Sequence, residues 1–377
     1  MLRVEGRLDE ALEHGLQATK EAPDDPDAHY NLGLVRHDRG ELAEAEASLR
    51  RALALAPEHA GAHFELAETL LLGGTFTEGW DEYEWRYKIP GAAATTPPTD
   101  KPFWRGEPMA GETLLLVADQ GFGDVIQFMR YIPRVAALCP ARAIACSAEM
   151  EPLVAQLSGD ARLFSLWRDA PAFDRYCTFS SLPRLFGARL GAIEASVPYL
   201  HADPARLDHW QQRLRSMTPM GYRRIGLVWA GRPAHGNDRN RSIRLHQLAP
   251  LGALDKTVLV SLQLGEAAVQ AGGYYGAAPL LNLGPEIRDF RDTAALLQTL
   301  DLLVTVDTAA AHLAGALGRP AAVLLPFAPD WRWLRDRNDS PWYPTLRLYR
   351  QARAGDWNDV VARLVDDLHH NGFSHRR

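Results

Sequence analysis

After residue 110 the chain alternates between short apolar runs and longer stretches in which apolar and polar residues are mixed. The run at residues 302–306, LLVTV, is apolar at almost every position rather than at every second one. That pattern is typical of a strand buried on both faces of a parallel sheet. Such strands, separated by helical stretches, predict a doubly wound α/β fold. The expected strands are residues 111–118, 141–146, 163–166, 225–229, 258–262, 281–283, 302–306, 321–325 and 346–349.

The first ninety residues follow a different pattern, which repeats every 34 residues. A shift of that length superposes Gly6, Gly40 and Gly74, and it also superposes Pro23 on Pro57. The middle copy resembles the tetratricopeptide repeat (TPR), a pair of helices whose small residues allow a close crossing. About two and a half copies are present, fewer than the three that a free-standing array needs. We therefore expect them to pack against the rest of the chain.

The third copy departs from the repeat because it is rich in aromatic residues. We expect it to dock onto the next domain, and stacking on a ligand is the alternative. Its aromatic residues are Phe76, Trp80, Tyr83, Trp85 and Tyr87. His29 and His63 take the same position in successive copies, where we expect them to pack rather than to bind a ligand.

The composition of the chain excludes several classes of protein and partner. The 377 residues are 46% hydrophobic and 23% charged, as in a globular protein, and the net charge of −6 argues against nucleic acid as the main partner. The three cysteines lack the spacing of a metal site and predict buried thiols in a reducing compartment. No apolar signal segment opens the chain and no apolar run approaches roughly 18 residues. We expect a cytoplasmic protein without an integral membrane segment, with any membrane contact peripheral, at the inner membrane.

A first candidate site is the loop at residues 119–124, DQGFGD, which follows a predicted strand and precedes a helix expected at residues 125–138. The loop lacks the full G-x-G-x-x-G spacing and a lysine, so it is neither a dinucleotide fingerprint nor a Walker loop. Asp124 falls at the start of the helix. A carboxylate at that place can cap the helix or act as a general base, and the residues alone leave both interpretations open.

A second candidate is the loop at residues 230–244, which contains four arginines and follows another predicted strand. Guanidinium groups at the carboxyl end of a strand suit a phosphate or pyrophosphate, and simple surface solubility is the alternative.

The third candidate is the turn after strand 302–306. Asp307 and Thr308 are both types that cap helices by accepting backbone N–H bonds, so a helix should begin there and end at Gly318. Small residues from Ala309 onward leave the first N–H groups of that helix accessible to an anion, and His312 lies one turn after Thr308. The alternative is a packing helix with a capping threonine and a buried histidine.

Together these motifs resemble the bacterial ADP-heptose:lipopolysaccharide heptosyltransferases (glycosyltransferase family 9), which have the two-Rossmann GT-B fold. The resemblance covers residues 111 to about 351. It rests on Gly123-Asp124, on RNRS at 239–242 and on DTAAAHL at 307–313. The last segment matches the family's D-T/S-G-x-x-H-L, with Ala309 where glycine is usual.

The resemblance implies that Asp124 is the base that activates the acceptor hydroxyl. It places Arg241 where the family keeps a lysine for the donor diphosphate, and because Arg241 and Ala309 depart from the pattern, neither heptose nor ADP is predicted for the donor. The implied donor-binding residues are Arg239, Arg241, Ser242, Gln263, Asp307, Thr308, Ala309 and His312, and the acceptor-side loop residues are Gln120, Gly121 and Gly123. No acidic D-x-D motif stands beside the arginine loop, so we expect a site without a metal and a protein without a cofactor.

The predicted fold class is therefore a pair of α/β Rossmann-like (GT-B-like) domains preceded by an all-α TPR segment. The expected divisions are TPR-like repeats at 1–90, a linker at 91–110, an N-terminal Rossmann-like acceptor domain at 111–205, a C-terminal Rossmann-like nucleotide-sugar domain at 206–351, and a C-terminal helix and tail at 352–377.

The predicted function is a metal-independent, hexosyl- or heptosyltransferase-like glycosyltransferase. It would move a sugar from a nucleotide-diphosphate-sugar to a glycan or protein acceptor, and the repeats would help to dock the acceptor or a partner protein. The alternative is a non-catalytic TPR scaffold with a degenerate glycosyltransferase-like domain. A nucleotide-sugar epimerase is disfavoured because it needs two acid/base groups on opposite faces of the sugar, and the sequence offers one.

Overall fold

The computed structural model describes residues 2–3, 5–90, 97–193 and 196–371. The chain forms two compact units. One comprises Met1–Gly106 with two later segments, Ser181–Ile193 and Ala328–Asp336, and the other comprises Glu107–Ser180, Glu194–Phe327 and Arg337–Arg377. Parts of the predicted linker and C-terminal tail, residues 91–96 and 372–377, lie outside the described residues.

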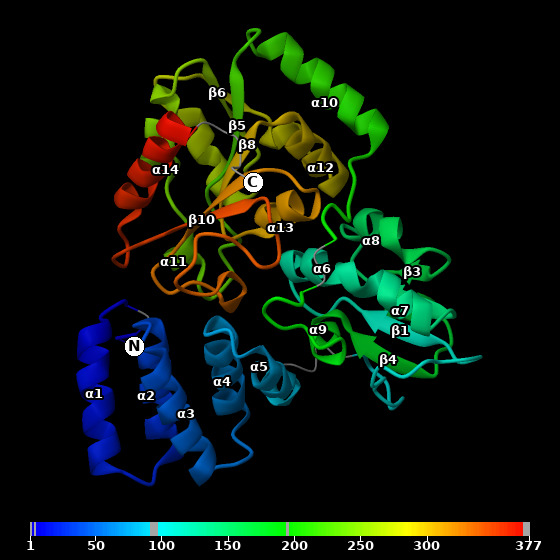
Figure 1. Cartoon of the computed structure of the whole chain (residues 1–377), viewed down its shortest axis with the longest axis vertical. Helices are drawn as coiled ribbons and strands as arrows, with labels where there is room; N and C mark the ends of the chain where they lie inside the picture. Colours follow the sequence, from blue (N-terminus) through cyan, green and yellow to red (C-terminus); the bar gives the residue numbers. More distant parts are fainter. Residues whose placement is uncertain (1, 4, 91–96, 194–195, 372–377) are drawn as a thin grey trace. The chain divides into compact units, whose positions relative to one another are not determined.

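The first unit is built from antiparallel helices, as the 34-residue period predicts (Figure 1). Gly40 and Gly74 both have positive φ, 74° and 85°, at the turns inside the second and third copies, where glycine adopts the left-handed conformation without strain. Gly33 allows a close helix crossing, because a Cβ atom there would lie 2.7 Å from Cγ of Leu49. The helices are α1 (Leu8–Glu21), α2 (Pro26–Asp38), α3 (Leu42–Leu55), α4 (Ala60–Leu72) and α5 (Phe76–Tyr83), followed by the 3-10 helix η1 (Glu84–Lys88).

The aromatic third copy packs against the two later segments of the same unit. Trp80 is 2% exposed, and its Nε1 donates a hydrogen bond to the carbonyl of Ala188 at 2.9 Å. Its ring meets Trp331 edge to face, with 5.1 Å between the centroids. Arg86 donates to the Ser181 hydroxyl at 2.8 Å. The short array therefore closes its open end with segments from elsewhere in the chain, and the docking interpretation of these aromatic residues is the one that the structure supports.

In the second unit the smaller sheet has four parallel strands in the order β3-β2-β1-β4. The helix expected at residues 125–138 is not continuous, and this prediction was wrong. A 3-10 turn, η3 (Met129–Tyr131), separates α6 (Phe122–Phe128) from α7 (Ile132–Leu138), and Pro133 falls in the first turn of α7, where its missing N–H costs no helix bond. The remaining elements are β1 (Leu114–Val117), β2 (Arg142–Ala145), α8 (Glu151–Ser158), β3 (Arg162–Phe164) and β4 (Arg175–Thr178).

The larger sheet has six parallel strands in the order β10-β9-β8-β5-β6-β7. Its strands are β5 (Arg223–Val228), β6 (Thr257–Ser261), β7 (Leu280–Asn282), β8 (Leu302–Val306), β9 (Ala321–Leu325) and β10 (Leu346–Arg350). Its helices are α10 (Pro204–Met217), α11 (Asp238–Arg241), α12 (Phe290–Thr299), α13 (Ala309–Ala316) and α14 (Trp357–Asn371), with the 3-10 helix η6 (Leu245–Ala253). All residues of the central strands β8 and β9 are buried, which agrees with their continuous apolar pattern.

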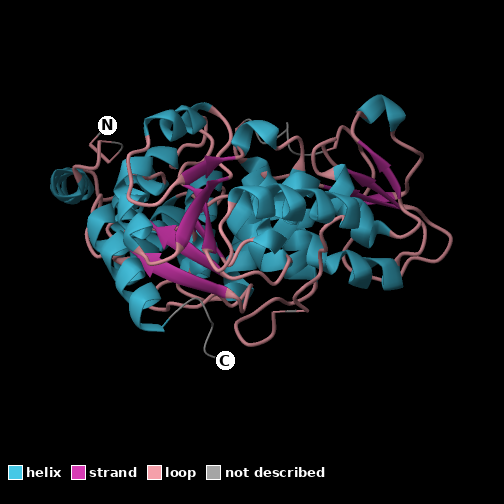
Figure 2. Ribbon diagram, turned by 90° about the horizontal axis from the view of Figure 1, so that it is seen from above, coloured by secondary structure: helices cyan, strands magenta, loops and turns pink. Residues whose placement is uncertain are grey.

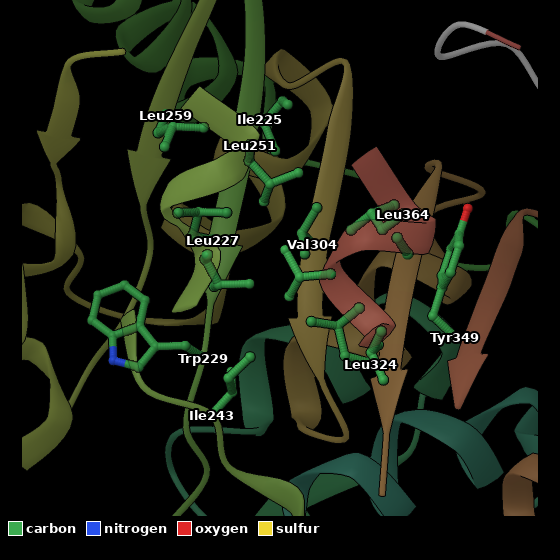
Figure 3. Packing of buried hydrophobic residues seen from close by; sticks show 14 of the residues in the cluster. Ile225, Leu227, Trp229, Ile243, Leu251, Leu259, Val304, Leu324, Tyr349 and Leu364 are labelled. Atoms are coloured by element: carbon green, nitrogen blue, oxygen red, sulfur yellow. The ribbon is translucent and has the colours of Figure 1, made fainter. Parts of the chain in front are cut away.

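Helices cover both faces of this sheet, with α14 on one side and α12 and α13 on the other (Figures 1 and 2). On the α14 side, Leu227, Val304 and Leu324 project from three adjacent strands into one core (Figure 3). Leu364 of α14 and Leu251 of η6 pack onto them. Each such leucine contributes about 1.5–3 kcal/mol by leaving water, so the core fixes the strand order and hence the loops at the sheet edge.

The predicted fold class is confirmed: an all-α repeat segment precedes two parallel α/β sheets. Among the described residues, no helix combines the length and the apolar character that crossing a bilayer would require.

Candidate functional site

The candidate loops gather at the carboxyl edges of the parallel strands. Strands β5 and β8 are direct neighbours, so the arginine loop after β5 and the turn at Asp307 after β8 leave from the same edge of the sheet. The loop after β1 leads into α6, and α6 packs against α13, the helix that begins after that turn. Loops at this edge are where open α/β sheets bind their ligands.

Gly123 and His312 lie in close approach at the contact between α6 and α13. A Cβ atom at Gly123 would lie 2.9 Å from Cδ2 and 3.3 Å from Nε2 of His312, so a larger residue would collide with the imidazole. His312 is 4% exposed, and its Nδ1 lies 3.1 Å from the hydroxyl of Tyr343. Gly123, the second glycine of the DQGFGD segment, is thus required by this close approach to His312.

Asp124 is the third residue of α6, and Gly121 is the N-cap. A Cβ atom on Gly121 would lie 3.3 Å from Oδ2 of Asp124, so the carboxylate folds back over the first turn. A negative charge there is stabilised by the helix dipole. Gln120 and Asp124 are partly exposed, as a residue that meets a substrate must be.

Thr308 does not cap α13 through its side chain, which corrects the sequence prediction. Within the described residues its hydroxyl makes no capping bond and instead lies 3.0 Å from the hydroxyl of Thr305. Thr305 in turn donates to the carbonyl of Val306 at 2.8 Å. Asp307, Thr308 and Ala309 are all partly exposed, so the start of α13 remains accessible.

The arginine loop is folded by its own polar groups. Arg241, at the end of α11, directs Nε to Oδ1 of Asp238 at 3.3 Å, and its guanidinium faces the backbone of Gly231. The hydroxyl of Ser242 accepts a hydrogen bond from the N–H of Gly231 at 3.0 Å. Arg239 is exposed, whereas the Arg241 side chain is only 14% exposed. Arg241 is therefore the more buried of the two predicted phosphate contacts, and Asp238 holds its guanidinium.

Gln263, at the end of β6, holds the start of this loop. Its Oε1 accepts hydrogen bonds from the N–H groups of Trp229 and Ala230, both at 2.9 Å. Its Nε2 donates to the carbonyls of Ala230 and Leu264 at 3.0 and 2.8 Å. Both donors and both acceptor positions of the amide are engaged. The structure thus supports a role in positioning the loop backbone, and direct contact with a donor stays a prediction.

Tyr343 is a site residue that the sequence reasoning missed. It belongs to an aromatic and charged segment after β9, and its ring lies on the backbone of α13, since a Cβ atom at Gly315 would be 2.3 Å from Cγ of Tyr343. A glycine in the middle of an otherwise alanine-rich helix was the available signal, because it marks a close approach. The sequence offered no means of telling which side chain approaches.

No group of three or more histidine, cysteine or acidic side chains is arranged to hold a metal ion among the residues that the structure describes. Metal independence itself stays a prediction. The three cysteines are buried and unbridged, as expected. Burial raises the pKa of Cys139 to about 11 and that of Cys146 to about 12, so both remain unreactive thiols at neutral pH.

Fold and loops together define a two-sheet parallel α/β protein with an N-terminal helical-repeat segment. A family model described as the tetratricopeptide repeat matches residues 2–58 and 38–84, which confirms the repeat.

Comparison with known proteins gives relatives for the whole chain and for its α/β part. The chain is 27% identical to Protein FlbA of Caulobacter vibrioides, over 92% of this chain, and spans only 62% of that protein's length. E. coli ADP-heptose lps heptosyltransferase II is 15% identical, covers 68% of this chain and 97% of its own, and has a TM-score of 0.48. A glycosyl transferase family 9 protein from Veillonella parvula is 11% identical, covers 71% and 98%, and has the same TM-score of 0.48.

Proposed function

We propose that this protein is a glycosyltransferase that moves a sugar from a nucleotide-diphosphate-sugar to a glycan or protein acceptor without a metal ion. The observation that carries the proposal is the packing of α6, which bears Asp124, against α13, which begins at the sheet edge shared with the arginine loop. A carboxylate on α6, and cationic side chains with free helix N–H groups near the start of α13, would supply the two functions that glycosyl transfer needs.

The chemistry follows from the charges. The bond between the anomeric carbon and the diphosphate breaks, the diphosphate leaves with the electron pair, and a new bond forms to the acceptor oxygen. Arg241 and the first N–H groups of α13 would stabilise the leaving diphosphate. Asp124 would take the proton of the acceptor hydroxyl, which is the work of a general base.

The scaffold alternative is favoured by one specific observation: Asp238 already pairs with Arg241. A carboxylate at that position competes with a phosphate for the guanidinium. Under the glycosyltransferase proposal the ion pair opens when a donor binds, whereas a non-catalytic scaffold would keep it closed.

Two measurements test the proposal. A thermal-shift screen over nucleoside diphosphates should find a stabilising ligand, since saturation at 100 times the dissociation constant contributes about 2.7 kcal/mol. Turnover of the matching nucleotide-sugar should then fall by about 10²–10⁴-fold in Asp124→Asn. Asp160→Asn, which changes an exposed carboxylate in the turn between α8 and β3, is the control. A protein that binds no nucleotide and releases no sugar would be the scaffold.

We further propose that the repeats dock the acceptor or a partner protein. The support is the family of the repeats, which pair helices to form a concave binding surface. A pull-down of candidate acceptors with and without substitutions on α2 and α4 would test this role. Equal capture by both proteins would remove it.

A further inference from the structure

Exposed apolar side chains gather at one edge of the smaller sheet. Residues 107–180, all of which the structure describes, include this sheet and have three exposed large hydrophobic side chains. They are Phe122, Leu166 and Trp167, which are 41%, 46% and 43% exposed, and we call them the apolar edge. Phe122 follows β1, and Leu166 and Trp167 follow β3. Because the strands are parallel, both loops leave from the carboxyl edge of the sheet.

The apolar edge lies beside the proposed base. Asp124 comes two residues after Phe122, and its Oδ2 would lie 3.3 Å from a Cβ atom on Gly121, so the carboxylate folds back towards the loop that bears Phe122. Only β2 separates β1 from β3. Two strand spacings amount to roughly 10 Å, which about three residues of an extended chain would span. One short extended segment is therefore long enough to reach both loops.

Both aromatic rings of the apolar edge are held by a second aromatic residue. The Phe122 ring meets Phe290, at the start of α12, edge to face, with 5.3 Å between the centroids and 85° between the planes. The Trp167 ring meets Phe164 of β3 in the same way, with 5.8 Å between the centroids. Each exposed ring is thus braced on one side, which reduces the conformational entropy that is lost when a ligand binds.

Charge and side-chain type indicate which ligand this surface suits. The loop at residues 119–124 contains no lysine or arginine, and Arg168, which follows Trp167, is itself followed by Asp169. An acceptor that carries phosphate or carboxylate groups would therefore meet no net positive charge here. Tryptophan and phenylalanine are enriched at protein interfaces, and the aliphatic Leu166 can pack against an apolar side chain but offers no hydrogen bond to a sugar. The surface thus favours a polypeptide over a glycan.

We propose that the acceptor is a polypeptide, whose serine or threonine hydroxyl meets Asp124 while neighbouring apolar side chains pack on the apolar edge. This assignment rests on the proposed function for the transfer step. In that step the hydroxyl oxygen bonds to the anomeric carbon, its proton passes to Asp124, and the diphosphate leaves with the electron pair of the broken bond. Phe122 and Trp167 take no part in this chemistry and instead select the acceptor.

Binding of peptides to the apolar edge can be measured without a donor. In protein labelled with para-fluorophenylalanine, the ¹⁹F resonance of Phe122, one of 12 phenylalanines, is assigned from its loss in Phe122→Leu. The probes are short synthetic peptides with a central serine flanked by leucine and valine, the same peptides with aspartate flanks, and maltotriose as a neutral glycan. We expect saturable shifts of the Phe122 resonance with the apolar peptides, and none with the aspartate peptides or maltotriose.

Phe122→Ala and Trp167→Ala should each weaken binding of the apolar peptides by about 10-fold, because each removes an aromatic anchor. The matched control is Tyr275→Ala, which truncates a 95% exposed ring outside the smaller sheet and should leave the affinity unchanged. No shift with any apolar peptide, a shift with maltotriose alone, or equal affinities in all three variants would overturn the inference. Peptide binding by a protein that transfers no sugar would refute the glycosyltransferase proposal alone, and sugar transfer that is equally fast in Phe122→Ala and Trp167→Ala would refute the polypeptide acceptor alone.

Discussion

At the residue scale, the contact of Gly123 with His312 is the point where a single atom matters. In Gly123→Ala the new methyl group would lie 2.9 Å from a ring that Tyr343 holds in place, so the ring or the helix must move. Overpacking of this kind costs about 1–3 kcal/mol, and the better helix propensity of alanine returns up to about 1 kcal/mol. We expect a net loss of about 1 kcal/mol in the free energy of unfolding, measured with urea.

The control for that substitution is Gly236→Ala, because a Cβ atom at Gly236 meets nothing within 4 Å and its φ is not in the left-handed region. That variant should be neutral or slightly stabilised, by up to about 1 kcal/mol, through the unfolded state. Equal stability of the two variants would show that the contact does not exist in solution.

The second residue-scale prediction concerns Arg241. Arg241→Ala should weaken binding of a nucleoside diphosphate by about 1–3 kcal/mol, because a charge-assisted hydrogen bond to phosphate is lost. Calorimetry on the ligand found by thermal shift measures this change. Arg232→Ala removes an exposed charge from the same loop and is the control. An unchanged dissociation constant in Arg241→Ala would exclude that guanidinium from the site.

At the scale of elements, helices α2 and α4 meet through a titratable group. His37 of α2 lies with Nδ1 2.9 Å from the hydroxyl of Thr69 on α4. Burial lowers the pKa of His37, and the nearby charges of Asp38, Arg3, Arg335 and Asp330 act on it more weakly. The unfolded chain therefore binds more protons than the folded one at acidic pH. This contribution to stability is complete above about pH 6.5, the ordinary pKa of histidine, and is lost as the pH falls from there towards the lowered pKa.

The prediction is that the urea midpoint of the protein falls between pH 7 and pH 5, and that His37→Gln flattens this part of the pH profile. His14→Gln replaces an exposed histidine of α1 and should leave the slope as it is in the wild-type protein. Parallel pH profiles for wild type and His37→Gln would mean that another group causes the acid sensitivity.

At the scale of the whole molecule, the repeat unit is completed by residues that follow β9. Trp331 is 2% exposed and contacts Trp80 and Tyr83 edge to face, at 5.1 and 6.0 Å between centroids. Arg335 also donates to the carbonyl of Gly40 at 2.5 Å. The repeats are therefore not an independent module, because part of their core comes from a segment about 250 residues further along the chain.

Trp331→Ala should accordingly destabilise the protein by about 3–5 kcal/mol, the range for truncating a buried aromatic side chain. Chemical denaturation of the full chain measures the loss. Trp167→Ala, at a tryptophan that is 43% exposed, should cost much less and serves as the control. Similar losses in both variants would contradict the proposed role of the 328–336 segment.

The sequence by itself determined most of the strands and the repeat helices, because burial leaves a local periodicity, but strand β4 (Arg175–Thr178) was not among the predicted strands. The continuous apolar run at β8 indicates a strand that is buried on both faces, and the 34-residue period indicates helices with one buried face. Neither pattern identifies the residues that pack against these faces. Local chemistry also shows in the residue types: aspartate is a common helix cap, and Asp289 caps α12 by accepting from the N–H groups of Arg291 and Asp292. The break between α6 and α7 was missed because the apolar pattern runs through it.

Only the tertiary structure decided which of these surfaces meet. Thr308 has the residue type of a cap, yet its hydroxyl lies beside Thr305, a partner that helix propensity does not consider. His312 was a candidate from its place in a motif, but its contacts with Gly123 and Tyr343 depend on sheet order and on packing between distant segments. The periodicity of apolar residues in the sequence indicates that a given side chain is buried, but it does not identify the residue that the side chain contacts. The partner of that side chain is set by the packing of the folded chain.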